Sequence, residues 1–301
     1  MENKSSSLVS VCLITYNHAK YIKEAIESVL IQNVNFEWEL IIADDFSTDG
    51  TREIILDYKN RFPNIIKLIL QPSNVGPQKN WLSLLAAADS KYIAYFEGDD
   101  YWIDSNKLQR QVDFLEKNSN YVACFTNAQI HFSSNRKNES YLKYTNDRSF
   151  NSYDIINGGG ALFPSASLVY RNIIKDFPSF FYDAKSGDRA LALMLLTFGD
   201  FYVLNFDSCV YRKHDNGIFT SIINEPLKRF EIDTNNIALL KAFNIYTKKK
   251  YQLAINKTIS SIAKNSLIRL YKSKNNSQKK KLYKFLIFSD WLSLIYNLLK
   301  K

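Results

Sequence analysis

Short apolar runs alternate with helical segments over the first 130 residues of this chain. The runs are rich in β-branched residues, and the segments between them repeat apolar side chains at helical spacing. Strands joined by helices form βαβ units, so we expect an α/β protein with a mainly parallel, Rossmann-like central sheet flanked by helices. The predicted strands are Leu8–Thr15, Trp38–Ala43, Ile65–Leu70, Lys91–Phe96 and Tyr121–Thr126, and the predicted helices are Tyr21–Gln32, Thr48–Arg61, Asn80–Ala88 and Leu108–Lys117.

Polar residues gather where three of these predicted strands end. Thr15–Asn17 follows the first strand, Asp44 and Asp45 follow the second, and Glu97–Asp100 follows the fourth. Ligands of parallel sheets bind at the carboxyl ends of the strands. The three segments therefore predict one shared site at this edge.

The run Glu97–Asp100 places three carboxylates within four residues directly after an apolar strand. Like charges packed together at a strand end repel one another and lose hydration, so a cation should compensate them. A hard divalent ion with oxygen ligands, Mg²⁺ or Mn²⁺, fits such a set. The alternative is a solvated acidic turn that caps a helix.

The second half of the chain has a less regular pattern. Residues 131–157 are polar and irregular, and after about residue 220 the apolar spacing is helical to the end. We expect a first domain over residues 1–220 and a basic helical C-terminal region over residues 221–301. Between 157 and 220 the pattern predicts two strands and one helix, at Ala166–Tyr170, Phe201–Tyr211 and Asp188–Phe198.

The positive charge of the chain lies at one end. The formal net charge is +9, yet residues 225–301 hold 17 Lys and Arg against 4 Asp and Glu, so the first 224 residues are mildly acidic. A nucleic-acid-binding protein would carry its basic residues on the folded domain. The distribution argues against that class.

The three cysteines and the polar start favour a cytoplasmic protein. Cys12, Cys124 and Cys209 lie in apolar runs without metal-type spacing, so we expect reduced core thiols. Residues 1–7 contain no apolar signal segment. No apolar stretch reaches the ~18 residues that a membrane-spanning helix needs.

Six segments resemble the motifs of family 2 glycosyltransferases, which have the GT-A fold. Ala43–Thr51 resembles their acidic DDxSxDGT segment, and Glu97–Asp100 stands where they carry the DxD metal motif. Val210–Gly217 resembles their YRxHxxG segment. The resemblance runs from Leu8 to Thr220 and divides the first domain into a nucleotide-binding part, 1–130, and an acceptor-side part, 131–220. The segments are Val9–Asn17, Ala43–Thr51, Asn74–Gly76 with Asn80, Glu97–Asp100, Gly187–Asp188 and Val210–Gly217.

The resemblance implies a hexosyltransferase-type enzyme that moves one sugar, with inversion, from a nucleoside diphosphate sugar, UDP-linked, to a hydroxyl group. The acceptor would be a saccharide or lipid-linked molecule of surface polysaccharide biosynthesis. Transfer of a single sugar is favoured because the QxxRW run of processive synthases is absent. The implied donor-binding residues are Thr15, Tyr16, Asn17, Asp44, Asp45 and Asp99, and the implied ligands of Mn²⁺ or Mg²⁺ are Asp99, Asp100, Glu97 and His214.

Asp188 is the implied general base, which would take the proton of the acceptor hydroxyl. The alternative is a helix N-cap, and a residue can serve in both ways. His214 is otherwise a hydrogen-bonded structural residue. For Ser47–Gly50 a turn is the preferred interpretation, because these residue types form turns and caps.

Two residues depart from the family pattern, one in the metal motif and one on the acceptor side, and two other functions stay open. Glu97 replaces the first aspartate of the metal motif, and Arg189 stands where many relatives have an aromatic residue. An inactive nucleotide-binding scaffold is one alternative. A nucleotidyltransferase acting on sugar phosphates is another, although it usually needs a glycine-rich basic loop where Thr15–His18 stands.

The segment Lys284–Lys301 is amphipathic when wound as a helix, with Trp291 on its apolar side and Lys279–Lys281 before it. Such a pattern is typical of a helix that lies in a membrane surface. The alternative is packing against protein. We therefore expect a peripheral contact with the inner face of the cell membrane.

Overall fold

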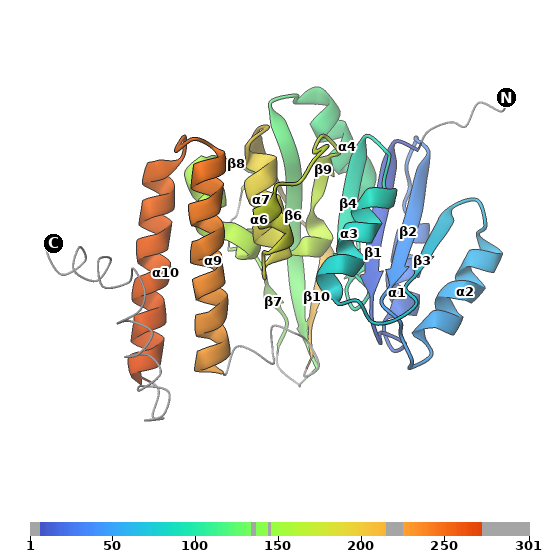
Figure 1. Ribbon diagram of the computed structural model, residues 1–301. Coiled ribbons are helices and arrows are strands. Elements are labelled where there is room, and N and C mark those ends of the chain that lie inside the picture. The colour runs from blue at the N-terminus through green and yellow to red at the C-terminus, as the bar shows by residue number, and fades with distance from the viewer. Residues whose placement is uncertain (1–6, 134–136, 144–145, 215–224, 273–301) are drawn as a thin grey trace, which may run out of the picture. The chain divides into compact units, whose positions relative to one another are not determined.

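The computed structural model describes residues 7–133, 137–143, 146–214 and 225–272 (Figure 1). The chain forms two compact units. The first comprises residues 1–151, 161–176 and 194–213, and the second comprises residues 152–160, 177–193 and 214–301. The parts of the predicted acceptor side at 152–160 and 177–193 thus pack with the C-terminal helices. The predicted boundary near residue 220 stays a prediction.

The first unit is built on a mixed sheet with the strand order β3-β2-β1-β4-β9-β6-β10-β5, in which β7 pairs with β6 and β8 with β10. The pairs β3–β2, β2–β1, β1–β4 and β6–β10 are parallel. The strands are β1 (Val9–Thr15), β2 (Trp38–Asp44), β3 (Ile66–Leu70), β4 (Tyr92–Glu97), β5 (Tyr101–Trp102), β6 (Tyr121–Phe132), β7 (Glu139–Ser140), β8 (Arg148–Phe150), β9 (Val169–Arg171) and β10 (Asp200–Lys213).

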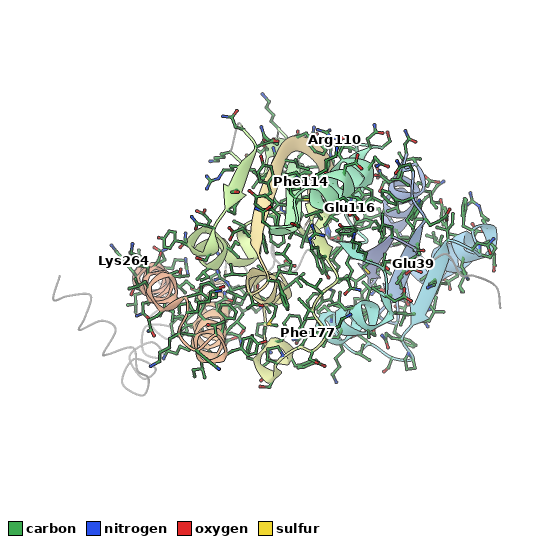
Figure 2. The ribbon with its side chains drawn as sticks, turned by 90° about the horizontal axis from the view of Figure 1, so that it is seen from above. Glu39, Arg110, Phe114, Glu116, Phe177 and Lys264 are labelled. Atoms are coloured by element: carbon green, nitrogen blue, oxygen red, sulfur yellow. The ribbon has the colours of Figure 1, made fainter. Side chains whose placement is uncertain are left out.

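Four helices join the parallel strands of this unit: α1 (Ile22–Leu30), α2 (Thr51–Arg61), α3 (Pro77–Ala87) and α4 (Lys107–Lys117). α1 is amphipathic and buries Ile22, Ile26 and Val29 in the core. α3 packs against β1 and β2, and α4 packs against β6 and β9 (Figure 1). On α4, the Phe114 ring, labelled in Figure 2, stacks 4.4 Å from that of Tyr202 in β10.

The second unit is helical. Its helices are α5 (Ser152–Gly158), α6 (Ser179–Tyr182), most of α7 (Gly187–Leu196), α9 (Pro226–Tyr246) and α10 (Gln252–Lys272). α9 packs along α10, and an ion pair between Asp233 and Arg269 joins them. Every helix in the described residues is too short or too polar to cross a bilayer.

The structure confirms the predicted α/β class, the mainly parallel sheet and the C-terminal helices. The three cysteines are buried free thiols. The prediction of a strand over Ala166–Tyr170 is partly wrong, because a 3₁₀ turn, Ser165–Ser167, precedes β9. The Ser167 backbone N–H and hydroxyl both donate to the Pro164 carbonyl, at 2.9 and 2.8 Å. Such local bonds compete with strand pairing.

Candidate active site

The parallel register brings the carboxyl ends of β1, β2 and β4 together. Thr15 pairs with Asp44, and Ile14 pairs with Glu97. The Asp45 N–H donates to the Thr15 carbonyl at 3.0 Å, and the Gly98 N–H donates to the Ile14 carbonyl at 2.8 Å. The three polar segments singled out in the sequence therefore share one edge of the sheet.

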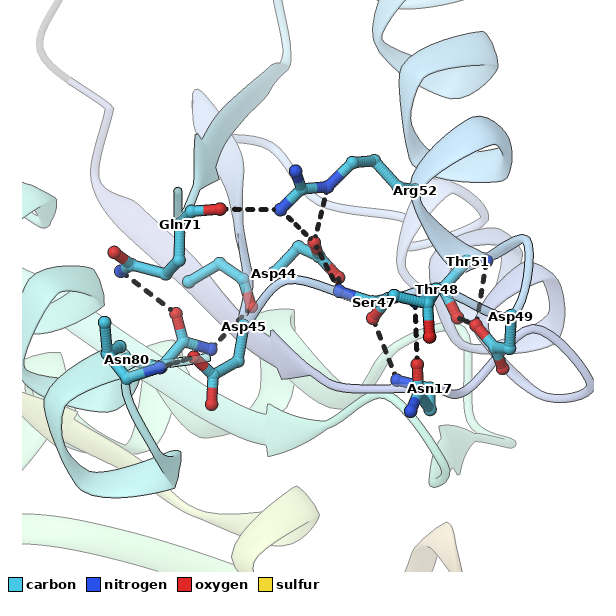
Figure 3. Close-up of polar contacts among 12 residues, drawn as sticks. Asn17, Asp44, Asp45, Ser47, Thr48, Asp49, Thr51, Arg52, Gln71 and Asn80 are labelled. Carbon is cyan, nitrogen blue, oxygen red and sulfur yellow. Dashed lines mark hydrogen bonds and ion pairs between the residues drawn. The ribbon is translucent and has the colours of Figure 1, made fainter. Parts of the chain in front are cut away.

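Asp44 is fully buried and its carboxylate is engaged within the protein (Figure 3). Arg52 reaches it from α2, with Nε at 2.8 Å and Nη2 at 2.7 Å from Oδ2. The Ser47 N–H donates to the same oxygen at 3.1 Å. Arg52 also donates to the Gln71 carbonyl at 2.9 Å, so this pair joins α2 to the end of β3. Arg52 could not be identified from the sequence pattern, because its partner lies in another element.

Asp45 is also buried, and it fixes the segment that leads into α3. Its two carboxylate oxygens accept the N–H groups of Val75 and Gly76, at 2.7 and 3.0 Å. Gly76 has a φ of 88°, a conformation that glycine adopts without strain. A carboxylate oxygen can accept more than one hydrogen bond, so Asp45 retains capacity for a ligand.

The turn after β1 is held by the acidic segment after β2 (Figure 3). Asn17 has a φ of 55°, its N–H donates to Ser47 Oγ at 2.8 Å, and its Oδ1 accepts the Thr48 N–H at 2.9 Å. Thr15 is buried, whereas the Tyr16 side chain is 44% exposed. Tyr16 and Asn17 are thus the exposed members of this group, and the Asn17 side chain is engaged with Thr48.

Asp49 belongs to the turn, as preferred from the sequence. Its Oδ1 accepts the N–H and hydroxyl of Thr51, at 3.1 and 2.6 Å, and its Oδ2 accepts the Ala19 N–H at 3.0 Å. Slight burial raises the pKa of Asp49, but these hydrogen bonds outweigh that effect and the pKa is lowered overall.

Asp100 is buried at 1% exposure beside Glu97 and Asp99, which are partly buried. Its Oδ1 accepts the Arg212 N–H at 2.9 Å. Its Oδ2 has no hydrogen-bond partner among the residues that the structure describes. Burial, followed by the charges of Asp99 and Glu97, raises the pKa of Asp100 well above its usual value. This loop therefore holds a buried carboxylate oxygen to which none of the described residues donates a hydrogen bond.

Arg212, near the end of β10, anchors the acidic loop. Its Nη1 donates to the Asp99 carbonyl at 2.6 Å, and its Nη2 pairs with Glu24 of α1. The guanidinium lies 4.3 Å from the centre of the Tyr101 ring. Arg212 belongs to a motif singled out in the sequence, but the motif gave no partner for it.

Tyr211 also belongs to the environment of the acidic loop. Burial raises the pKa of its hydroxyl, and the charges of Asp100 and Glu97 raise it further. The alternation of a strand could have indicated that Tyr211 and Arg212 face opposite ways. Only the fold shows that both lie near the carboxylates.

A divalent cation fits the donor set of this loop. The described residues contain no group of three or more His, Cys, Asp or Glu side chains arranged to enclose a metal. A cation such as Mg²⁺ is commonly held by one or two carboxylates together with substrate phosphates and water, and it does not need an enclosing protein cage. The buried Asp100 Oδ2 and the adjacent Asp99 supply oxygen ligands of that kind.

Asp188 lies in the first turn of α7 and is partly buried. Burial raises the pKa of its carboxyl group to about 6. A Cβ placed on Gly160 would lie 3.3 Å from the Asp188 Cβ, so Gly160 packs closely against this residue. Its neighbour Arg189 is buried and donates to the Ile156 carbonyl at 3.1 Å. Asp188 belongs to the second unit, and its role as a base stays a prediction.

His214 follows Lys213, the last residue of β10, and is partly buried. Its role as a metal ligand also stays a prediction. The remainder of its motif, residues 215–217, lies outside the described residues.

The family model described as Glycosyl transferase family 2 matches residues 10–175, and the chain belongs to this family. The uncharacterized protein Rv1520 of Mycobacterium tuberculosis is 32% identical to this chain over 234 residues. That alignment covers 76% of this chain and 66% of Rv1520. A second relative is WfgD of Escherichia coli, the UDP-Glc:alpha-D-GlcNAc-diphosphoundecaprenol beta-1,3-glucosyltransferase. It is 35% identical to this chain over 112 residues, and the alignment covers 37% of this chain and 42% of WfgD. Each match thus spans less than two thirds of the relative.

Solved structures show the same fold. TarS 1-349 of S. aureus, crystallised with UDP-GlcNAc, has a TM-score of 0.61 and 19% identity over 89% of this chain and 74% of that chain. The mannosyltransferase PcManGT from Pyrobaculum calidifontis, in complex with GDP-Man and Mn²⁺, has a TM-score of 0.55 and 14% identity over 96% of this chain and 83% of that chain. At these identities the likeness establishes a GT-A-type α/β fold.

Replacing Arg212 with Met should weaken nucleotide binding about tenfold, or ~1.4 kcal/mol, because the Asp99 carbonyl loses its charged donor. Titration calorimetry with a nucleoside diphosphate and Mn²⁺ would measure this loss. Arg61→Met is the matched control, since Arg61 pairs with Asp57 on the exposed surface at 3.3 Å. Equal nucleotide affinity in the two variants would contradict the anchoring role of Arg212.

Proposed function

We propose that this chain is a metal-dependent, inverting glycosyltransferase of the hexosyltransferase type. It transfers a single sugar from a nucleoside diphosphate sugar, UDP-linked, to a hydroxyl of a saccharide or lipid-linked acceptor in surface polysaccharide biosynthesis. Membership of glycosyl transferase family 2 supports the reaction class. The observation that carries the proposal is the buried Asp100 oxygen, which has no hydrogen-bond partner in the described part of the chain and lies on a loop at the edge that also holds Asp44 and Asp45.

The contacts of the described residues suggest different roles for the two aspartates after β2. Asp44 is engaged by Arg52 and Ser47, so its part is to position the loop. Asp45 accepts two backbone N–H groups and retains lone pairs, which suit the imide N–H of a uracil. The exposed Tyr16 ring and the Asn17 turn complete the proposed nucleoside site.

Asp99 and Asp100 are the proposed ligands of Mn²⁺ or Mg²⁺, with Glu97 and His214 as further contacts. Asp99 is also proposed to lie near the ribose. When bound, the cation supplies positive charge that stabilises the departing nucleoside diphosphate. Arg212 would hold the loop in a geometry that can bind the cation. It does so through hydrogen bonds to the Asp99 carbonyl and the Asp100 carboxylate. The Mn²⁺ bound by the mannosyltransferase supports a divalent cation by analogy of fold.

Asp188 is the proposed general base. With a pKa raised to about 6, its carboxylate is ionised at neutral pH and is a stronger base than an ordinary aspartate. It would accept the proton of the acceptor hydroxyl as that oxygen attacks the anomeric carbon. One displacement inverts the anomeric centre, so the protein needs no nucleophile of its own.

The proposal of a lipid-linked acceptor is based on the activity for which one relative is named. WfgD is named as a glucosyltransferase that acts on a diphosphoundecaprenol-linked sugar. A lipid-linked acceptor would place this chain in the cytoplasm at the inner face of the membrane. The predicted amphipathic helix at Lys284–Lys301 agrees with that location, although it lies outside the described residues.

The proposal is tested by thermal unfolding of the full chain with a panel of UDP-, GDP- and TDP-linked sugars, with Mn²⁺ or with a chelator. One donor should raise the unfolding temperature in the presence of Mn²⁺, because a ligand that binds the native state stabilises it. If no nucleotide or nucleotide sugar binds under either condition, the proposed activity is wrong.

Asp100→Asn separates a ligand-binding role from a structural one. Removing the buried charge should raise the unfolding temperature of the ligand-free protein, since the isosteric amide oxygen can still accept the Arg212 N–H. The same variant should bind the donor with Mn²⁺ on the order of a hundredfold more weakly, or ~2.7 kcal/mol. Asp57→Asn, on the exposed surface, is the matched control. A less stable Asp100→Asn protein with unchanged donor affinity would make Asp100 structural.

The base role predicts a pH profile. Below about pH 6 the transfer rate should fall about tenfold per pH unit, because protonated Asp188 cannot accept a proton. Asp188→Asn should lower the rate by about 10²–10⁴-fold while donor affinity stays within about twofold. Rates from pH 4.5 to 8 and a parallel donor titration check both effects. Loss of donor binding in this variant would instead show that Asp188 maintains the fold.

A further inference from the structure

The hairpin of α9 and α10 has an unusual charge pattern. No Asp or Glu occurs between Asp233 and Asp290, whereas residues 234–272 hold eight Lys and Arg. A surface with basic residues and no acidic ones attracts anionic partners, and it does so less strongly as salt increases. None of these residues is part of the candidate active site.

The turn between the two helices adds exposed apolar side chains to this charge. We call residues 245–253 the hairpin tip. Ile245 is 76% exposed, Tyr246 is 49% exposed and Leu253 is 83% exposed, and Lys248–Lys250 are exposed between them. Ile245 and Leu253 lie at the same end of the hairpin. The residues that precede them, Asn244 and Gln252, are joined by a hydrogen bond of 3.3 Å from Nδ2 to Oε1.

The tip is a fixed turn. The Lys249 N–H donates to the Asn244 carbonyl at 2.8 Å, and the Gln252 N–H donates to the Lys249 carbonyl at 3.1 Å. The rings of Phe243 and Tyr251 stack beneath it at 5.8 Å. The exposed side chains are therefore presented on an ordered backbone.

Two residues of the tip have a backbone conformation that side chains other than glycine rarely adopt. Lys248 and Lys249 have φ values of 50° and 65°. Glycine or asparagine would satisfy the turn at lower backbone cost. The chain has lysine at both positions, so the sequence keeps positive charge where the local structure favours other residues. Such conflicts are found where a residue serves a function.

We propose that the hairpin tip docks on the surface of an anionic lipid bilayer. Lysines next to aliphatic and tyrosine side chains suit this surface, because the ammonium groups meet lipid phosphates while the apolar side chains enter the boundary of the hydrocarbon. A nucleic acid would match the charge but would leave Ile245 and Leu253 in water. This inference does not depend on the proposed catalytic activity or on the predicted helix at Lys284–Lys301.

The test measures binding of the full chain to vesicles of phosphatidylglycerol and phosphatidylcholine, against vesicles of phosphatidylcholine alone. Lys248→Gly/Lys249→Gly removes two charges, and each lysine near an anionic surface accounts for about fivefold in partitioning. Vesicle affinity should therefore fall about 25-fold. The unfolding temperature should hold or rise, since glycine suits a positive φ. A loss of binding could then not be attributed to unfolding.

The matched control is Lys228→Ser/Lys264→Ser, which removes the same charge from exposed positions on the same two helices. Lys264, labelled in Figure 2, lies roughly 18 Å along α10 from its start, and Lys228 is farther from the tip along α9. This control should lose less than about fivefold in vesicle affinity. The variant Ile245→Ser/Leu253→Ser should lose about tenfold while keeping the salt dependence.

Three results would overturn the inference. The tip variants could bind anionic vesicles as tightly as the unchanged chain, or the control pair could lose as much as the tip pair. The third result is a tip variant that binds vesicles as before but has a changed oligomeric state in sedimentation, or has lost the electrophoretic mobility shift of a nucleic acid. That outcome would assign the tip to a protein or nucleic-acid partner.

Discussion

The burial of the Asp100 carboxylate beside Glu97 and Asp99 is the constraint on which the candidate site depends. Packing these groups at a strand end costs hydration and charge repulsion, and the raised pKa of Asp100 expresses that cost. The Arg212 N–H and guanidinium offset part of it from β10. A second charge of the right sign, a divalent cation, would offset the rest. The protein thus stores an unfavourable arrangement that a ligand can relieve.

The sheet places the other residues of the candidate site next to the acidic loop. Parallel pairing of β1 with β2 and β4 sets Thr15 beside Asp44 and the preceding Ile14 beside Glu97, so the polar residues end the three strands at one edge. Buried polar bonds then fix the loops beyond the strands. Asp44 holds Arg52, and Asp45 holds the segment before α3. Because these bonds are made before a nucleotide arrives, the proposed donor site is ordered in advance.

Local pattern predicts β1–β4, β6, β10, the helices α1–α4 and the polar edge of the sheet, but not the short strands β5, β7 and β8 or the helix α5 within the stretch expected to be irregular. β-Branched runs mark β1 and β2, and the rule that parallel strands bind ligands at their carboxyl ends placed the carboxylates together. The pattern could not predict side-chain partners that come from distant elements. Arg52 lies outside the predicted site for this reason, and the motif that contains Tyr211 and Arg212 does not identify the carboxylates near them. Lys107 shows the same limit: it opens α4, yet it is fully buried with its ammonium 4.2 Å from the centre of the Trp102 ring.

We propose that the acidic loop supplies only part of the coordination of a divalent cation and that a nucleoside diphosphate completes it. Electron paramagnetic resonance of Mn²⁺ titrated into the protein, with and without UDP, tests this directly. Mn²⁺ alone should bind weakly and should bind much more tightly when UDP is present, with broadening of the Mn²⁺ signal that depends on Asp100. Tight binding of Mn²⁺ without any nucleotide, or no bound Mn²⁺ under either condition, would contradict it.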